Sequence, residues 1–327
     1  MAAVDQPFQK IKLVRIAHVF YKHKDPKAAI QFLHDFGFSQ EKTAGHRTYF
    51  RGYGTQPFVV CVEAADETAW GGACFEVETA EDLERAATQL PAAVKATAVY
   101  DLADIDAPGG GRGVTFYDPV DGFPMHLVHG QTKVAARDPN FPIVHLNYPA
   151  EKNRPVNKFQ RFEKRPAPVH KLGHFGMCVT NFAQSYDFYV THFNFFPSEL
   201  VHDDSGTNHT VFFRLDRGDE QVDHHTFFLF QGPRWHVHHT SYETHDFDTQ
   251  VLGHDWLRAK GYTNCWGVGR HVMGSQIFDY WFDPAQFILE HYVDGDLLDM
   301  SEPTHVTLEK DAHLHVWGPD VPPTFLV

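Results

Sequence analysis

The chain has 327 residues, 43% hydrophobic and 14% aromatic, which excludes a disordered protein and at roughly 150 residues per domain suggests about two domains. Its formal net charge of −14 disfavours nucleic acids and anionic membranes as partners, because both require a basic surface. No apolar run approaches the roughly 18 residues of a membrane span, and no secretory signal opens the sequence. We therefore expect a cytoplasmic protein that binds small molecules and other subunits.

Cysteine and histidine usage points to imidazole chemistry. The four cysteines form no CxxC pair and are too few to cross-link a chain of this size, so neither disulfides nor thiolate-bound zinc are indicated. The 24 histidines are the most unusual number in the composition. Imidazole binds metals and carries protons near neutral pH, yet most of these residues must have ordinary roles. Only their positions in the fold can identify the few histidines that bind a metal or transfer protons.

The N-terminal half begins with a predicted strand and helix. Residues 14–38, VRIAHVFYKHKDPKAAIQFLHDFGF, contain a strand with His18, then Asp25 as N-cap, Pro26 at the first helical position and a helix that ends at Gly37. Short strands follow in HRTYFRGY and FVVCVEA, and TAEDLERAATQL predicts a second helix. GVTFYDPVDGFPMHLVHG then gives strand, Asp-Pro turn and strand.

The C-terminal half repeats this order. HKLGHFGMCVTNFAQSYDFYVTHFNFF has a strand with His174, a polar cap near Thr180 or Asn181, and a helix. Strands are predicted for HTVFFRL and HHTFFLFQ, and a helix is predicted for DFDTQVLGHDWLRAKG. The half closes with a strand, an Asp-Pro turn and a second strand in QIFDYWFDPAQFILEHYVDG. In the two closing strands His126 and Glu290 occupy similar places. Each half is mixed α and β, and together they indicate an internal repeat.

A proline-rich and charged stretch separates the halves. Residues 135–168 show neither helical nor strand periodicity, which is typical of a connecting segment. We place the boundary near residue 150, which gives an N-terminal domain with linker at 1–150, a C-terminal domain at 151–300 and a tail at 301–327. The prolines of GPDVPPTFLV forbid regular structure there. The tail packs against a domain or, alternatively, forms a lid.

Three side chains of the C-terminal half fit the donor set of a non-haem metal site. Two histidines and one carboxylate from separate strands can occupy one face of a metal ion and leave other positions open. His174 lies in the first strand, a histidine cluster lies at 236–239, and Glu290 lies in a very apolar strand. A carboxylate there is costly unless it is paired or metal-bound. A hydrogen-bonded core histidine and a solvent-facing glutamate are the alternatives.

These segments resemble the type I extradiol ring-cleaving dioxygenases of the vicinal oxygen chelate superfamily. The resemblance depends on KLGHFG, DHHTFFLFQGPRWHVHH, GVGRHVMGSQIFDYWFDPAQFILEHY and VWGPDVP, which occur in the family's order over nearly the whole chain. It implies an α+β fold of two domains, each of paired βαβββ modules, with metal only in the C-terminal domain. It also implies that Fe(II), occasionally Mn(II), supports insertion of both atoms of O2 into a catechol-type ring beside its hydroxyls, giving a semialdehyde-type product.

Carried to this sequence, the resemblance makes His174, His239 and Glu290 the metal ligands. Strand alternation separately places His239 on the face opposite His236 and His238. His238 would then at most support the site, and His236 would be a surface or packing residue.

The resemblance also assigns residues that act on the substrate. The acid/base histidine corresponds to His224, which would accept a proton from a substrate hydroxyl and return it later. His225 would face the other side of the strand, although a one-residue slip in register exchanges the two. His271 and Tyr280, nine residues apart, match the pair that hydrogen-bonds the substrate oxygen and orients the ring.

The sequence departs from the family in three places. Phe175 and Gly176 follow His174, so a side-chain contact to O2 that some relatives supply there is absent. DAHLH, before WGPDVP, lacks the arginine pair that relatives use for a carboxylate-bearing substrate, which weakens homoprotocatechuate as the substrate. His18 and His126 echo the ligand positions, but AWGGACFEV offers no middle histidine, so we expect the N-terminal domain to be a metal-free repeat.

Other functions occur on the same fold. The superfamily includes metal-dependent glyoxalase-type isomerases and small-molecule binding proteins, which have no reason to keep His224, His271 and Tyr280 around one site. An unrelated metal hydrolase would need clustered ligands such as HVH at 236–238, which alternation turns away from His239. The favoured hypothesis is a homo-oligomeric extradiol dioxygenase that acts on a catechol and O2. The sequence identifies neither the ring substituents nor the bond cleaved.

Overall fold

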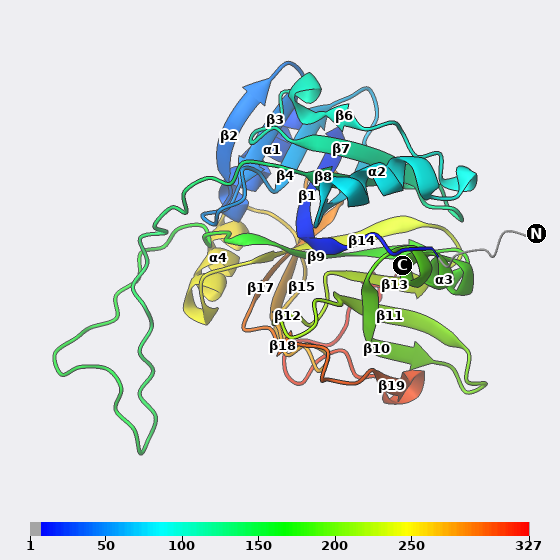
Figure 1. Ribbon diagram of the computed structural model, residues 1–327. Coiled ribbons are helices and arrows are strands. Elements are labelled where there is room, and N and C mark those ends of the chain that lie inside the picture. The colour runs from blue at the N-terminus through cyan, green and yellow to red at the C-terminus, as the bar shows by residue number, and fades with distance from the viewer. Residues whose placement is uncertain (1–7, 327) are drawn as a thin grey trace, which may run out of the picture.

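The computed structural model describes residues 8–326, which form two mixed sheets with α-helices packed on them (Figure 1). An eight-stranded sheet contains the strands between residues 13 and 129, and a nine-stranded sheet contains most strands between residues 171 and 308. This is the predicted α+β fold of two domains built from paired βαβββ modules. None of the helices in the described part of the chain is long and apolar enough to cross a membrane.

The N-terminal sheet is built from two similar halves. Its elements are β1 (Leu13–His23), α1 (Pro26–Phe36), β2 (Ser39–Ala44), β3 (Arg47–Arg51), β4 (Val60–Ala64), β5 (Ala69–Val77), α2 (Ala80–Gln89), β6 (Tyr100–Asp101), β7 (Arg112–Tyr117) and β8 (Pro124–His129). The strand order is β2-β3-β4-β1-β5-β8-β7-β6. The first strand of each half pairs in parallel with the last strand of that half, and β1 and β5 join the halves antiparallel.

The C-terminal sheet repeats this plan. Its elements are β9 (Lys171–Val179), α3 (Phe182–His192), β10 (Phe195–His202), β11 (Asn208–Leu215), β12 (Val222–Asp223), β13 (Phe227–Gln231), β14 (His236–Glu243), α4 (Phe247–Ala259), β15 (Asn264–Arg270), β16 (Ile277–Phe282), β17 (Ile288–Val293), β18 (Leu297–Leu298) and β19 (His305–Leu308). The strand order of the large sheet is β15-β16-β17-β14-β9-β13-β11-β10-β19. Strands β9, β14 and β17 are therefore neighbours at its centre, although they come from opposite ends of the domain.

Local sequence signals determine where the helices begin and end, as predicted. The Asp25 carboxylate accepts the backbone N–H of Ala28, and Gly37 ends α1 with φ of +112°, a conformation that favours glycine. Asn181 caps α3 by accepting the N–H of Gln184. The four α-helices thus follow from caps and amphipathic patterns that are visible in the sequence.

The two domains share one hydrophobic core. Its largest group of buried apolar side chains takes residues from both domains, and the ring of Phe36 in this group stacks on that of His291 in β17, 3.7 Å away. Buried hydrogen bonds cross the same boundary. The Asn194 side chain accepts from the backbone N–H of Leu13 at 2.7 Å and donates to its carbonyl at 3.1 Å. Burial of unpaired backbone groups is costly, so these bonds fix how the domains meet.

The chain between the sheets leaves the body of the protein. Residues 130–170 contain no helix or strand, and Figure 1 shows much of this stretch as a two-limbed loop that projects beyond α4. A single β-bridge joins Asn147 and Lys152 near its end.

Asp283 titrates at the domain interface. Its carboxylate accepts the backbone N–H groups of Ala285 and Phe287, and it lies 3.8 Å from the Nε2 of His23 in β1. Burial raises the pKa of Asp283 to about 7. Between about pH 4 and 7 the folded protein therefore holds a proton that the unfolded chain has lost, so the contribution of this carboxyl to stability falls as the pH rises through that range.

We expect Asp283→Asn, which keeps an oxygen acceptor but cannot ionise, to gain stability relative to the wild type as the pH rises from about 4 to 7. The gain should be at most about 1.4 kcal/mol per pH unit and should level off above pH 7. Urea unfolding across this range measures it. Asp204→Asn, at a side chain that is 84% exposed, is the control. Its free energy of unfolding should differ from that of the wild type by a nearly constant amount across this pH range. A pH-independent difference in unfolding free energy between Asp283→Asn and the wild type would contradict the raised pKa of Asp283.

Candidate metal centre

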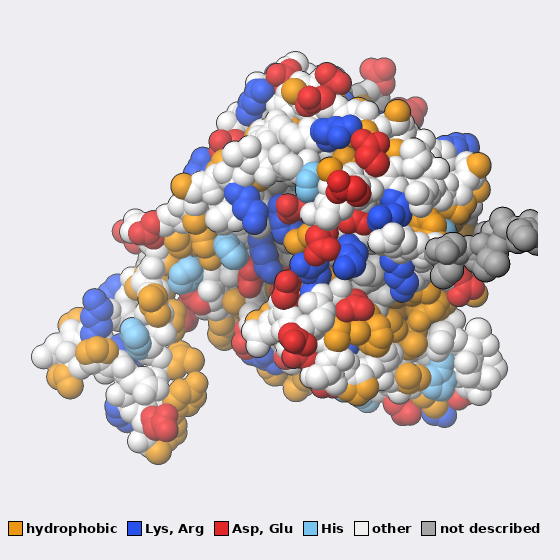
Figure 2. Space-filling view, in the orientation of Figure 1, with side chains coloured by type: hydrophobic (Ala, Val, Ile, Leu, Met, Phe, Trp, Pro, Cys, Tyr) orange, Lys and Arg blue, Asp and Glu red, His pale blue; other side chains and the backbone are white. Residues whose placement is uncertain are grey.

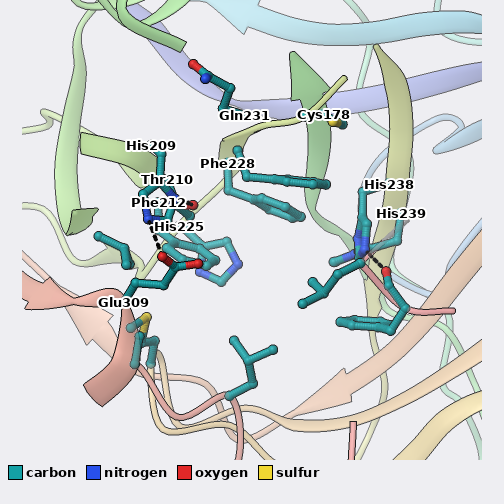
Figure 3. Close-up of a pocket in the computed structure, with 18 of the residues that line it drawn as sticks. Cys178, His209, Thr210, Phe212, His225, Phe228, Gln231, His238, His239 and Glu309 are labelled. Carbon is teal, nitrogen blue, oxygen red and sulfur yellow. Dashed lines mark hydrogen bonds and ion pairs between the residues drawn. The ribbon is translucent and has the colours of Figure 1, made fainter. Parts of the chain in front are cut away.

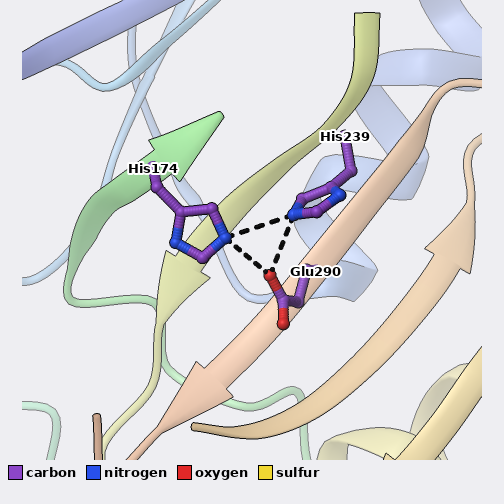
Figure 4. A group of neighbouring side chains, drawn as sticks. All are labelled: His174, His239 and Glu290. Carbon is purple, nitrogen blue, oxygen red and sulfur yellow. Dashed lines mark hydrogen bonds and ion pairs between the residues drawn. The ribbon is translucent and has the colours of Figure 1, made fainter. Parts of the chain in front are cut away.

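Three neighbouring strands bring His174, His239 and Glu290 together. His174 lies on β9, His239 on β14 and Glu290 on β17, and β14 pairs with both of the other strands. The Nε2 atoms of the two imidazoles are 3.1 Å apart, and they lie 3.2 and 3.3 Å from the Oε2 of Glu290 (Figure 4). In the described part of the chain this is the one group of three such side chains with ligand atoms close enough to hold a metal ion.

The surroundings of Glu290 fit a metal better than a purely structural role. Its side chain is 0% exposed, and neither carboxylate oxygen receives a hydrogen bond of ordinary geometry. Burial alone would raise the pKa of Glu290, but the two imidazoles outweigh it and hold the pKa well below its usual value. A buried carboxylate is costly unless it is paired or coordinates a cation. Two imidazoles and a carboxylate are a donor set suited to Fe(II), Mn(II) or Zn(II).

Burial keeps three imidazoles at this centre, those of His238, His239 and His271, in the neutral form. Burial lowers the pKa of His239, partly opposed by Glu290. Burial also lowers the pKa of His238 to about 3 and that of His271 to about 4. At neutral pH these ring nitrogens are therefore free to bind a metal or to accept hydrogen bonds.

His225, rather than His224, faces the centre. The chain leaves regular strand structure between β12 and β13, so the alternation expected from residue 224 onward does not hold. The ring of His225 lies 4.1 Å from that of His174 and lines the same cavity. His224 points the other way, with its Nε2 3.6 Å from the Oε1 of Glu199, into a separate polar cavity of about 450 Å³. The two histidines are joined by their Nδ1 atoms, 3.0 Å apart.

His271 and Tyr280 lie together beside the ligands, as their spacing predicted. The Nδ1 of His271 donates to the carbonyl of Leu314 at 2.6 Å. In a neutral ring its Nε2 must then accept, so the Tyr280 hydroxyl donates to it at 2.8 Å. The lone pairs of the Tyr280 oxygen remain available to a donor such as a substrate hydroxyl.

A β-bulge changes the orientation of the histidine cluster. The pairing of β14 with β9 shifts register between Val237 and His239. As a result His238 and His239 are both only 4% exposed and both line the cavity, whereas simple alternation would have separated them. His236, expected at the surface or in packing, is half-buried at the edge of the same cavity.

Phe228 and Gly176 shape the cavity next to the ligands. A Cβ atom on Gly176 would lie 1.7 Å from the Phe228 ring, so glycine is required where that ring crosses β9. The same ring lies 5.0 Å from that of His239. The space that a side chain at position 176 would occupy is therefore filled by the Phe228 ring from β13.

The candidate ligands His174 and His239 line a cavity of about 630 Å³ with mostly apolar walls (Figure 3). Side chains of the C-terminal tail complete it, including Phe325, whose ring lies 4.8 Å from that of Tyr280. The apolar and aromatic lining includes Val201, Phe212, Phe228, Phe230, Met273, Leu314, Phe325 and Leu326. At the rim Glu309 lies 3.7 Å from His209, and Arg234 is exposed. Among the described residues that line the cavity, Arg234 is the one lysine or arginine.

The corresponding histidines of the N-terminal domain have other partners. His126 bonds to the Thr115 hydroxyl at 2.8 Å and to the Gly71 carbonyl at 2.9 Å, so both of its ring nitrogens are engaged. His18 is buried against the ring of Phe58, 4.0 Å away. These positions echo the ligand strands but present no matching carboxylate.

Residues 171–290 match the model of the Glyoxalase/Bleomycin resistance protein/Dioxygenase superfamily. The match begins in β9 and ends at Glu290, so it contains all three candidate ligands, and this segment is a domain of that superfamily. Metapyrocatechase 2 from Cupriavidus necator is 32% identical over 122 residues, which cover 34% of this chain. The matched segment spans only 38% of the length of that curated relative.

Solved structures share the fold over nearly the whole chain. The Mn(II)-bound glyoxalase from Novosphingobium aromaticivorans has a TM-score of 0.77 at 23% identity, with 96% of this chain and 94% of that chain covered. Homoprotocatechuate 2,3-dioxygenase from Arthrobacter globiformis has a TM-score of 0.78 at 18% identity, with 98% and 92% covered. At these identities the likeness establishes the fold alone. The fold that the sequence motifs implied is thus confirmed, and the superfamily model matches the segment that contains the candidate ligands.

We expect Glu290→Gln to abolish tight binding of a divalent metal, since it removes the negative charge of the donor set. The loss should exceed about 100-fold, because removal of a group that merely supports a ligand already costs about 10- to 100-fold. Titration of the metal-free protein with Fe(II) or Co(II) under anaerobic conditions measures it. Glu309→Gln, at the cavity rim, is the matched control and should bind as the wild type does. Equal binding by Glu290→Gln would exclude Glu290 as a ligand.

Proposed function

We propose that the protein is an extradiol dioxygenase that inserts both atoms of O2 into a catechol-type ring beside its hydroxyls. The observation that supports this most is one apolar cavity lined by His174, His239, His225 and Tyr280, with the Glu290 carboxylate buried within 3.3 Å of the two candidate histidine ligands. When bound, Fe(II), or Mn(II) in its place, would supply the positive charge that acidifies the catechol hydroxyls and the redox chemistry that O2 requires.

His225 is the proposed acid/base residue, in place of His224. It lies beside His174 at the wall of the cavity, where its ring can accept a proton from a substrate hydroxyl and return it as the ring opens. Its Nδ1 contacts the Nδ1 of His224, so its Nε2 is the atom left for the substrate. Burial, reinforced by His174 and His224, lowers the pKa of His225 well below its ordinary value, which keeps the resting imidazole neutral.

Tyr280 and His271 are proposed to hold the substrate oxygen. Because Tyr280 donates to His271, its oxygen can accept a hydrogen bond from a substrate hydroxyl on the side of the ligands. The apolar walls lower the local dielectric constant, which strengthens such hydrogen bonds.

The cavity supports a catechol with a bulky apolar substituent as the substrate. A volume of about 630 Å³ lies in the range of about 300–1,000 Å³ that pockets for drug-sized ligands occupy, which exceeds the needs of a single ring. Four phenylalanines and two leucines contribute to the wall, and the exposed Arg234 is its one lysine or arginine among the described residues. A carboxylate on the substituent would therefore find no buried lysine or arginine among the described residues of the wall.

A glyoxalase-type isomerase is the second candidate, because the Mn(II)-bound glyoxalase has the same fold. Isomerisation needs a metal and a base but neither O2 nor the Tyr280–His271 pair. Consumption of O2 therefore separates the two functions.

We expect Fe(II)-loaded protein to consume one O2 per catechol and to form a yellow ring-opened product. His239→Ala should abolish this. His225→Gln should lower kcat about 10²- to 10⁴-fold, the usual contribution of a general acid/base, whereas His224→Gln should lower it less. An oxygen electrode and product absorbance measure both. Turnover by His239→Ala, or no O2 consumption by metal-loaded wild type with any catechol, would disprove the activity.

We expect kcat/KM to be higher for a catechol with an aryl or branched alkyl substituent than for catechol itself, and lowest for one with a carboxymethyl group. The reason is the burial of apolar surface in the cavity and the absence of a buried cation. Competition between pairs of substrates, followed by mass spectrometry of the products, measures the ratios. A preference for the carboxylate-bearing catechol would contradict the assignment of substrate class without affecting the assignment of reaction.

A further inference from the structure

A chain of hydrogen bonds runs from the C-terminal tail to a metal ligand. The carbonyl oxygen of Phe325 lies 2.5 Å from the Nε2 of His238, and a carbonyl can only accept. The Nε2 of His238 therefore carries the proton, and in a neutral ring its Nδ1 becomes an acceptor. That Nδ1 lies 2.7 Å from the Nδ1 of His239. His239 must then carry its own proton on Nδ1 and leave the lone pair of Nε2 free.

This lone pair points at the candidate metal position. The Nε2 of His239 is the atom that faces both His174 and Glu290. We infer that His238 and the Phe325 carbonyl are positioning groups that hold His239 in the one tautomer able to bind a metal. The inference rests on the proposed metal centre, and it assigns a role to His238, which strand alternation had turned away from the site.

Substitution of His238 separates this role from mere packing. His238→Phe removes the acceptor, whereas the amide oxygen of His238→Gln can still accept the N–H of His239. We expect metal affinity to fall about 10- to 100-fold in His238→Phe and to be largely restored in His238→Gln. His236→Phe, on the same strand, is the control and should bind as the wild type does. Anaerobic Co(II) titration, read from its visible spectrum, gives the affinities.

The tautomer can be read directly in the metal-free protein. In ¹⁵N-labelled wild type, long-range ¹H–¹⁵N spectra should show His239 protonated on Nδ1 and His238 on Nε2. The opposite protonation of His239, or wild-type affinity in His238→Phe, would overturn the inference. If no metal binds to the wild type, the proposed function fails, while the spectra still decide the tautomer.

A second inference comes from the loop between the domains. Residues 141–164, here called the arm, project from the body and form no helix or strand (Figure 2). The ends of the arm are fixed, because the Arg165 guanidinium lies 3.6 Å from the centre of the Phe141 ring and donates to the carbonyl of Asn140. Further out, His145 donates its backbone N–H to the Gln160 side chain, 3.0 Å away. The limbs are thus tied to each other, without a core of their own.

The arm exposes apolar side chains that the rest of the protein would bury. Five of the fourteen exposed large hydrophobic side chains in the described part of the chain lie on it: Ile143 (76%), Leu146 (54%), Tyr148 (53%), Val156 (91%) and Phe159 (68%). Such a concentration is typical of an interaction surface. The arm has 24 residues, within the roughly 20–30 that one side of a stable protein interface contributes.

The charge of the arm identifies the partner. It carries five lysines and arginines against two glutamates, whereas the whole chain has 28 basic and 42 acidic residues. Arms of two molecules would repel each other, but the arm of one and the acidic body of another attract. We propose that the arm docks on the body of a second copy of this chain, in a reciprocal exchange that buries both arms.

Deletion of the arm tests this proposal without disturbing the sheets, because Arg165 and Asn140 already lie in contact at its base. We expect the wild type to sediment as a dimer or larger assembly, and a variant with residues 142–163 replaced by a short glycine linker to sediment as a smaller species. Val156→Asp and Phe159→Asp should have the same effect. Val306→Asp, at a 60% exposed residue on the body, is the control and should leave the mass unchanged.

Cross-linking of a mixture of ¹⁴N- and ¹⁵N-labelled protein identifies the contact. Cross-links between molecules should join lysines of the arm, such as Lys152 and Lys158, to residues of the body. A monomeric wild type, an unchanged mass after deletion, or exclusive arm-to-arm cross-links would each overturn the proposal.

Discussion

The C-terminal domain is organised around one carboxylate in an apolar interior. Glu290 has no exposed surface, and its carboxylate lies 3.2 and 3.3 Å from the imidazole nitrogens of His174 and His239 on two other strands. A buried charge of this kind is tolerated only when cations or donors meet it with good geometry. The sheet order β9-β14-β17 follows this requirement, since it places the three residues side by side. The aromatic walls, the tail and the supporting histidines are arranged around that contact.

In the described part of the chain one half alone brings three candidate ligands together, although both halves share the same strand framework. In both sheets the first strands of the two modules pair antiparallel at the middle, and each pairs in parallel with the last strand of its own module. In the N-terminal copy the place of Glu290 is taken by His126, which is bound to Thr115 and Gly71. The same framework therefore brings three candidate metal ligands together in one copy, whereas the equivalent histidine of the other copy is engaged by hydrogen bonds.

Much of the fold and the candidate ligands could be predicted from the sequence, because the signals are local. Asp25 and Gly37 mark the ends of α1, and the apolar strand around Glu290 makes its charge conspicuous. The orientation of neighbouring histidines could not be predicted, because it depends on pairing with distant strands. The backbone N–H of Thr226 bonds to the carbonyl of Phe213 just before β13 begins, which turns His225 inward. The bulge in β14 likewise depends on β9 and brings His238 into the cavity.

The shared hydrophobic core has a thermodynamic consequence for the whole chain. Because buried residues of both sheets form one continuous cluster, neither domain can unfold without exposing apolar surface of the other. The two halves should then unfold in a single cooperative transition. A ligand bound only to the C-terminal sheet would raise the free energy of unfolding of both halves by mass action. A metal ion at the candidate centre would therefore also stabilise the N-terminal domain.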